Sequence, residues 1–307
     1  MDREEEVYII IPCFNEGQTI IKLIHEIEEV LNNSSVKCTA VIVDDCSNDN
    51  TLSLLTSLQL TGNLNLKVLA LQYNLGHQGA IAQGLLYANE CKASSAIIMD
   101  GDGEDDPSAL PELLSLRKND IVHVIRGKRR EKIVFRTAYR TYRMIFRVLT
   151  NKKMNFGNYC LVSSKVITVT SSRTFIHFAA FLSKLQFNAV SITYDRRKRI
   201  GGDSKMNLTS LVHHAFRSFI EYAQALLMVF LKLFVFLFVF LIITIGYIIY
   251  MKIFTTYPIL GWSSTFGIGI LTSALVCMGF FVIGVLLLNL SQDRATLKPI
   301  AAYRVAK

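Results

Sequence analysis

Ala96-Ile97-Ile98-Met99-Asp100-Gly101-Asp102-Gly103-Glu104-Asp105-Asp106-Pro107 joins a short apolar run to a cluster of carboxylates. The apolar run predicts a buried strand, and the acidic turn after it would present several oxygens at the carboxyl edge of a sheet, where α/β sheets bind ligands. The glycines on either side of Asp102 allow the backbone to approach a ligand closely. Such oxygens suit a divalent cation and a phosphate-bearing ligand. The alternative is an acidic surface turn that only keeps a loop soluble.

Strand and helix signals alternate around this stretch. Continuous apolar runs, typical of buried strands, occur at 7–11, 40–43, 67–71 and 96–99. Apolar residues at helical spacing occur between them, at 19–31, 51–60 and 80–88. This order predicts an α/β fold with a mainly parallel, Rossmann-like sheet covered by helices on both faces. Polar clusters follow three strand ends, at Asn15-Glu16, Asp44-Asp45 and Asp100, and the fold would bring them to one edge.

The C-terminal third has the composition of membrane spans. Residues 233–250 and 254–290 contain no Asp, Glu, Lys or Arg, and each run is long enough for one crossing of a bilayer. Apolar residues from 208 to 227 recur at spacings of three and one, which predicts an amphipathic helix in the membrane interface, although a core helix has the same pattern. The predicted parts are a catalytic domain (1–207), the amphipathic helix (208–231), a two-helix transmembrane hairpin (232–290) and a cytoplasmic tail (291–307).

Charge predicts the orientation in the membrane. Of the 33 Lys and Arg residues, only Lys252 lies between the predicted spans, so the positive-inside rule places the large N-terminal part and both termini in the cytoplasm. The net charge of +9 does not indicate nucleic-acid binding, because the basic residues gather toward the membrane segments without interleaved stacking motifs. The six cysteines show no metal-type spacing, as expected for reduced thiols.

Five stretches of the chain, taken in order, resemble the motifs of one enzyme family. They are Ile11-Pro12-Cys13-Phe14-Asn15-Glu16, Val43-Asp44-Asp45-Cys46-Ser47-Asn48-Asp49-Asn50-Thr51, Asn74-Leu75-Gly76-His77-Gln78-Gly79-Ala80, the acidic turn from Asp100 to Pro107, and Arg196-Arg197-Lys198-Arg199-Ile200-Gly201-Gly202-Asp203-Ser204-Lys205. Together they resemble family-2 glycosyltransferases of GT-A type. More narrowly, they are similar to polyprenyl-phosphate sugar transferases such as dolichyl-phosphate mannose synthase and the bactoprenol glucosyltransferases.

The resemblance implies a donor site built on these motifs. The residues expected to bind the nucleotide are Pro12, Asn15, Glu16, Asp44, Asp45, Gly76, Asp100 and Gly101. Asp100 and Asp102 match the family's Asp-x-Asp, which binds Mg²⁺ or Mn²⁺ against the donor diphosphate. Glu104 stands where the family often has Gln and could be a third metal ligand.

Basic residues are expected to hold the acceptor or its phosphate. The candidates are Arg126, Lys128, Arg196, Arg199, Ser204 and Lys205, of which Arg196, Arg199 and Lys205 join Asp100 and Asp102 as candidate catalytic residues. Arg197 and Lys198 are assigned instead to an anionic lipid surface. His77 matches the bactoprenol-type pattern and is interpreted as a structural hydrogen-bonding residue. Asn158 and Cys160 depart from the Asp and Arg that many relatives carry.

The expected reaction is an inverting transfer of a hexose from a nucleotide-sugar to polyprenyl phosphate. The expected partners are the nucleotide-sugar, polyprenyl phosphate, the bilayer and a second copy of the chain. A processive polysaccharide synthase is one alternative, but its Gln-x-x-Arg-Trp signature is missing, since the only tryptophan, Trp262, lies between the predicted spans. A non-catalytic scaffold that binds nucleotide or lipid is the other alternative.

Overall fold

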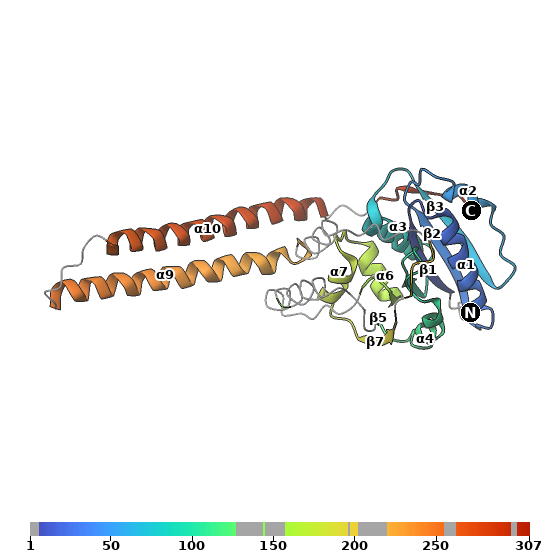
Figure 1. The fold of residues 1–307 in the computed structure, drawn as a ribbon, viewed down its shortest axis with the longest axis horizontal. Coiled ribbons are helices and arrows are strands. Elements are labelled where there is room, and N and C mark those ends of the chain that lie inside the picture. The colour runs from blue at the N-terminus through green and yellow to red at the C-terminus, as the bar shows by residue number, and fades with distance from the viewer. Residues whose placement is uncertain are drawn as a thin grey trace. The chain divides into compact units, whose positions relative to one another are not determined.

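A computed structural model describes residues 6–126, 144, 157–195, 197–201, 220–254, 262–295 and 300–307 (Figure 1). The chain divides into two compact units. The first comprises Met1–Arg143, Lys153–Glu221 and Leu297–Lys307, and the second comprises Met144–Lys152 and Tyr222–Thr296. The chain therefore leaves the first unit before the apolar helices and returns to it after them.

The first unit contains a mixed, mainly parallel sheet. Its strands within the described residues are β1 (Glu6–Cys13), β2 (Lys37–Asp44), β3 (Leu64–Leu71), β4 (Ser95–Ile98), β5 (Ile121–Arg126), β6 (Cys160–Ser163), β7 (Ala189–Tyr194) and β8 (Tyr303–Val305). They lie in the order β7-β5-β6-β4-β1-β2-β3-β8. Strands β4, β1, β2 and β3 are parallel, while β6 is antiparallel to both its neighbours. The predicted parallel core is confirmed.

Helices follow the strands and cover both faces of the sheet. They are α1 (Gly17–Leu31), α2 (Thr51–Ser57), α3 (Gly76–Glu90), a 3-10 helix (η1, Pro107–Ala109), α4 (Leu110–Ser115), α6 (Ser164–Ser171) and α7 (Phe178–Lys184). Alternate residues of β1 enter two different apolar clusters: Ile9 packs with α1 and α4, and Ile10 packs with α3, α6 and α7. Because both faces of each central strand are buried, these strands are continuously apolar.

Four helix boundaries differ from those expected. Two differ by two residues, since α1 begins at Gly17 instead of residue 19 and α3 ends at Glu90 instead of residue 88. The other two differ by more. Helix α2 ends at Ser57 instead of residue 60, and α3 begins at Gly76 instead of residue 80. The earlier start of α3 has a local cause, since the Asp45 carboxylate accepts a hydrogen bond from the backbone N–H of Leu75 at 2.7 Å. A carboxylate in this position satisfies an N–H that the helix itself leaves unpaired.

The C-terminal segment, expected as a tail, contributes a strand to the sheet. Strand β8 pairs antiparallel with β3, with Val305 opposite Leu69, and Figure 1 marks the C-terminus beside β3. The side chain of Gln83 holds this segment, since its amide donates to Ile300 O at 3.2 Å and its oxygen accepts from Ala302 N at 2.9 Å. The segment covers the edge of β3, whose backbone groups would otherwise lack partners.

The second unit contains two long apolar helices. Helices α9 (Ala223–Phe254) and α10 (Trp262–Ala295) are each long and apolar enough to cross a membrane. Contacts of Phe230 with Phe280 and of Phe240 with Phe266 show that they run antiparallel, as a hairpin requires. The predicted boundary between interface helix and span, at 231–232, falls inside the continuous α9. Residues 208–219 of the predicted interface helix lie outside the described part of the chain.

Candidate active site

The ends of β1 and β2 are joined by a network of loop hydrogen bonds. Asp45 N donates to Cys13 O at 2.9 Å, which ties the two strand ends together. Asn15 has a φ of 53°, in the left-handed region that asparagine tolerates better than most residues. Its backbone N–H donates to Ser47 Oγ, and its side-chain oxygen accepts from Asn48 N, both at 2.9 Å. Glu16 N donates to Thr51 Oγ1 at 3.2 Å. Asn15, Glu16 and Asp45, which are predicted to bind the nucleotide, therefore lie in loops that hydrogen bonds hold together at the strand ends.

Asp44 has a buried carboxylate with unused hydrogen-bonding capacity. The residue is 2% exposed, and its Oδ2 accepts from Ser47 N at 3.4 Å. Its Oδ1 has no hydrogen-bond partner among the described residues. Burial raises the pKa of Asp44 above its usual value. A buried acceptor in this state is costly for the free protein and suited to a donor group on a ligand.

Asp45, the next residue, is used by the fold. Its carboxylate accepts from Leu75 N, and Asn74 Nδ2 donates to its backbone oxygen at 3.1 Å. Burial raises its pKa, and the hydrogen bonds from Leu75 and Gly76 oppose this effect. Gly76 lies directly after this contact with a φ of 74°. Asp45 thus fixes the start of α3 beside the site.

The acidic turn after β4 is held by its own carboxylates. Asp105 Oδ2 accepts from Asp100 N, and Asp102 Oδ1 accepts from Glu104 N, both at 3.0 Å. Glycine is required at 101, because a Cβ there would lie 2.7 Å from Pro12 O. The close approach of the turn to the end of β1 explains one of the two glycines in this motif.

His77 lies against the first carboxylate of the turn. Its Nε2 is 3.3 Å from Asp100 Oδ1 and 3.0 Å from Asn158 Nδ2. Desolvation lowers the pKa of His77, but its hydrogen bond to Asp100 and the charges of Asp100, Asp102 and Asp105 outweigh this effect and raise it. The carboxylates of the turn therefore act together on one imidazole.

The carboxylate oxygens of the acidic turn fit a cation that is coordinated by both the protein and a ligand. Among the described residues, no group of three or more His, Cys, Asp or Glu side chains is arranged to hold a metal ion, so Glu104 does not form such a group with Asp100 and Asp102. Two carboxylates from one strand end leave coordination positions for the oxygens of a diphosphate. Asp100 and Asp102 fit this chemistry.

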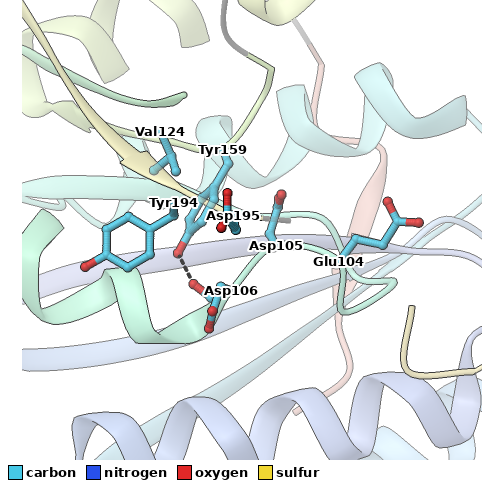
Figure 2. Close-up of a pocket in the computed structure, with 7 residues that line it drawn as sticks. All are labelled: Glu104, Asp105, Asp106, Val124, Tyr159, Tyr194 and Asp195. Atoms are coloured by element: carbon cyan, nitrogen blue, oxygen red, sulfur yellow. Dashed lines mark hydrogen bonds between the residues drawn. The ribbon is translucent and has the colours of Figure 1, made fainter. Parts of the chain in front are cut away.

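A small pocket lies on the β5 and β7 side of the turn and does not include Asp100 or Asp102. It is lined by Glu104, Asp105, Asp106, Val124, Tyr159, Tyr194 and Asp195. Figure 2 shows the Glu104 carboxylate pointing away from Asp105 and Asp106, and Tyr159 OH donating to Asp106 O at 2.9 Å. The acidic turn supplies three of these residues, but no sequence motif indicated Val124, Tyr159, Tyr194 or Asp195, which come from other parts of the chain.

The segment 197–201 crosses the acidic turn. Arg197 N donates to Glu104 O at 3.0 Å, and Ile200 N donates to Asp102 O at 3.4 Å. Gly103 has a φ of 75°, and a Cβ on it would lie 2.4 Å from Ile200 Cδ1. Arg199 pairs with Glu16, so one predicted phosphate-binding residue reaches one predicted nucleotide-binding residue.

Arg197 is paired with carboxylates of the first unit. Its guanidinium contacts Glu26 at 2.7 Å and Asp106 at 3.8 Å. The assignment of Arg197 to an anionic lipid surface stays a prediction, although Glu26 and Asp106 already pair with its guanidinium. Sequence reasoning separated Arg197 from Arg196 and Arg199, but it could not identify the carboxylates that Arg197 contacts.

The other predicted phosphate-binding residues are only partly described. Arg126 ends β5, opposite Tyr194 of β7. Lys128, Arg196, Ser204 and Lys205 lie outside the described residues.

Residues 8–183 match the family described as Glycosyl transferase family 2. The chain belongs to this family. As a family 2 glycosyltransferase, it is 24% identical to the uncharacterized glycosyltransferase YkcC of Bacillus subtilis (strain 168), over 92% of this chain and 89% of that protein. It is 26% identical to an undecaprenyl-phosphate 4-deoxy-4-formamido-L-arabinose transferase of Yersinia enterocolitica, over 69% of this chain and 66% of that protein.

Solved structures share the fold of this family 2 glycosyltransferase. Mannosyl-3-phosphoglycerate synthase from Rubrobacter xylanophilus has a TM-score of 0.55 at 15% identity, over 72% of this chain and 74% of that chain. Glucosyl-3-phosphoglycerate synthase from Mycobacterium tuberculosis, in complex with Mn²⁺, UDP and glucosyl-3-phosphoglycerate, has a TM-score of 0.53 at 14% identity, over 72% and 80%. The first unit therefore has the GT-A, Rossmann-like fold.

Proposed function

We propose that this glycosyltransferase transfers a hexose, with inversion, from a nucleotide-sugar of the UDP-glucose or GDP-mannose type to polyprenyl phosphate. The product would be a lipid-linked sugar for cell-surface glycan assembly. The observation that carries the proposal is the contact of the acidic turn, at Asp102 and Glu104, with the basic segment 197–201, in a chain that also has two apolar helices. The similarity to undecaprenyl-phosphate sugar transferases supports the choice of acceptor.

The nucleotide would bind at the ends of β1 and β2. The buried Asp44 Oδ1 can accept a hydrogen bond from a ribose hydroxyl or a base N–H. Pro12, Asn15 and Glu16 would line this nucleotide site, with Asp45 and Gly76 behind them. Gly101 keeps room for the backbone of the turn to approach the diphosphate.

Asp100 and Asp102 would hold Mg²⁺ or Mn²⁺ between the protein and the donor diphosphate. When bound, the cation neutralises negative charge on the departing nucleoside diphosphate. The two carboxylates keep their place through the turn, because Asp102 accepts from Glu104 N and Asp105 accepts from Asp100 N.

The acceptor needs positioning more than activation. A phosphate monoester is ionised near neutral pH, so its oxygen can attack the anomeric carbon without a strong general base. Arg199 would exchange its contact with Glu16 for a phosphate oxygen, since guanidinium groups bind phosphate through two parallel hydrogen bonds. Arg126, Lys128, Arg196, Ser204 and Lys205 are the other residues proposed for phosphate binding.

The two apolar helices would place the enzyme at its lipid substrate. Few of their side chains are buried, in contrast to the core helix of a soluble protein. The segments before α9 and after α10 belong to the same unit, so a membrane hairpin would put both chain termini on one side. The distribution of Lys and Arg supports the cytoplasmic side. Contacts between hairpins of two copies would allow a homo-oligomer.

The direct test uses membranes that contain the protein. They are incubated with polyprenyl phosphate and radiolabelled UDP-, GDP- or dTDP-sugars, with and without Mg²⁺ or Mn²⁺. The proposal expects label in the lipid extract with one donor, dependent on the cation. Absence of such label with every donor would contradict it. Thermal stabilisation of the purified protein by the same nucleotides identifies the donor independently.

Asp102→Asn distinguishes an enzyme from a scaffold. The substitution keeps the size of the side chain and its ability to accept from Glu104 N, but removes the charge expected to bind the cation. An enzyme would lose at least about 100-fold in transfer rate, which is typical for removal of a charged group that stabilises the transition state. A scaffold would keep its cellular role with this variant.

A further inference from the structure

The contact between His77 and Asp100 joins three elements and has no part in the reaction proposed above. His77 lies in the first turn of α3, Asp100 follows β4, and Asn158 precedes β6. Strands β4 and β6 are antiparallel, with Ile98 opposite Cys160. Extending this register by two residues places Asp100 opposite Asn158. The His77 imidazole lies against both, at 3.3 and 3.0 Å.

The turn that carries His77 is fixed on both sides. Before it, Leu75 N donates to the Asp45 carboxylate at 2.7 Å. After it, Gln78 is 8% exposed, and its Oε1 accepts from Phe178 N at 2.6 Å, which ties α3 to α7. The backbone of His77 therefore has little freedom, and the partners of its ring are Asp100 and Asn158.

The contacts determine which group donates. A ring nitrogen beside a carboxylate oxygen has to carry hydrogen, because two lone pairs would repel each other. Nε2 of His77 is therefore the donor, and the Asn158 amide has to present its oxygen to the same N–H. Turning the amide by half a rotation achieves this. It also gives a partner to Asn158 Oδ1, which otherwise has none among the described residues although Asn158 is 8% exposed.

We propose that His77 is a positioning residue: its Nε2–H donates to Asp100 Oδ1 and to the Asn158 amide oxygen, and it thereby fixes the direction in which the Asp100 carboxylate faces a divalent cation. This inference rests on the proposed function, which requires the cation. Groups that hydrogen-bond to metal ligands set the orientation of those ligands and typically change metal affinity 10- to 100-fold. The amide oxygen of Asn158 accepts the hydrogen bond without adding a negative charge that would compete with Asp100 for the cation.

The test measures Mn²⁺ binding to the full-length protein in detergent, by the electron paramagnetic resonance signal of free Mn²⁺, with and without UDP. His77→Ala should weaken Mn²⁺ binding by about 10-fold. His77→Gln should return it to within about threefold of the wild type, because the glutamine amide nitrogen extends to where Nε2 lies. His77→Asn should behave like His77→Ala, because its shorter side chain ends near the position of Nδ1. The melting temperature of each variant controls for folding.

Two results with the single variants would overturn the inference. One is wild-type Mn²⁺ affinity in His77→Ala, and the other is equal affinity in His77→Gln and His77→Asn. The double variant His77→Ala/Asn158→Ala should bind Mn²⁺ no more weakly than His77→Ala, because Asn158 acts through the imidazole. Additive losses of Mn²⁺ affinity in the double variant would contradict the proposal that Asp100 and Asn158 share the Nε2–H of His77.

The same measurements separate this inference from the proposed function. Mn²⁺ affinity that depends on His77, without sugar transfer from any donor, would reject the proposed function and keep the positioning role. Cation-dependent transfer by a protein whose Mn²⁺ affinity is indifferent to His77 would do the reverse. A wild-type protein that binds no Mn²⁺, with or without UDP, would reject the inference outright.

Discussion

Two adjacent aspartates at the end of β2 have opposite roles. The Asp45 carboxylate accepts a hydrogen bond from Leu75 N at the start of α3. In contrast, one buried oxygen of Asp44 has no hydrogen-bond partner among the described residues. The fold therefore tolerates at Asp44 a charge that destabilises the free protein. Such a residue is expected at a binding site, where a ligand completes the hydrogen bonding.

Asp44→Asn should weaken nucleotide binding and stabilise the free protein. Loss of the charged acceptor should raise the Kd of the preferred nucleoside diphosphate about 10-fold, measured by calorimetry. Removal of the buried charge should raise the free energy of unfolding at pH 7 by about 1 kcal/mol. Because burial raises the pKa of Asp44 in the folded state, the unfolded state loses its proton first as pH rises. The stability gain should therefore vanish as the pH falls toward the usual pKa of 3.8. A constant gain across pH would contradict this assignment.

The site residues that sequence could identify share a local signature. Asp44 and Asp100 each follow an apolar run directly, Asp102 lies two residues after Asp100, and the edge of a parallel sheet is where ligands bind. Asp45 caps α3 through Leu75, which lies about 30 positions away in the chain. Arg197 pairs with Glu26 and Asp106, which lie more than 90 positions away. No pattern in a single sequence records such pairings.

At the scale of elements, the acidic turn and the segment 197–201 form one unit. Backbone hydrogen bonds join them at Glu104 and Asp102, and the absence of a side chain at Gly103 makes room for Ile200. The basic segment is thereby held against the carboxylates instead of extending into solvent. The position of its arginines depends on this close packing.

Gly103→Ala should separate the two elements, and Gly76→Ala provides a matched control. Both glycines have φ near 75°, which costs an alanine about 1 kcal/mol. Only at Gly103 would the new Cβ also meet a neighbour, since none lies within 4 Å at Gly76. Gly103→Ala should therefore lose at least about 2 kcal/mol in unfolding free energy, against about 1 kcal/mol for Gly76→Ala. Adding Ile200→Ala to Gly103→Ala should recover the difference. Equal losses in the two single variants would show that Ile200 does not limit this packing.

The Gln83 contacts predict how strongly β8 is held. Gln83→Ala should lower the free energy of unfolding by about 2 kcal/mol, because two backbone groups lose a buried partner. Gln83→Glu keeps the acceptor for Ala302 N but places an oxygen against Ile300 O. It should be as destabilising at pH 7 and partly recover in acid, where a protonated carboxyl can donate. Hydrogen exchange of residues 303–305 and of β3 measures the release of the strand. Unchanged protection in both variants would mean that Gln83 does not hold it.

At the scale of the whole molecule, the sequence predicted the central parallel strands and the two apolar helices, and it missed β5, β6, β7 and β8. Long apolar runs carry a local signal that survives folding. Strand β8 has three residues, and its pairing joins Leu69 to Val305. A strand of that length has no periodicity, and its partner is more than 200 residues away. Such contacts arise only from the complete fold.

The arrangement of the chain predicts that both ends of the hairpin face the same compartment. Cys91, exposed in the first unit, should react with a membrane-impermeant maleimide only in inside-out vesicles. Thr256→Cys, placed between the two helices and combined with Cys91→Ser, should react only in right-side-out vesicles. Labelling of both positions from one side would exclude a membrane hairpin.

Strand β8 also sets an order of events during synthesis. The ribosome makes it after α9 and α10, so β3 has no edge partner until both apolar helices have been translated. An unpaired edge invites association with other chains. A nascent chain halted before residue 300 would keep that edge open, and the sheet is completed only when residues 303–305 pair with β3. Complete folding of the first unit therefore requires that both apolar helices have already been translated.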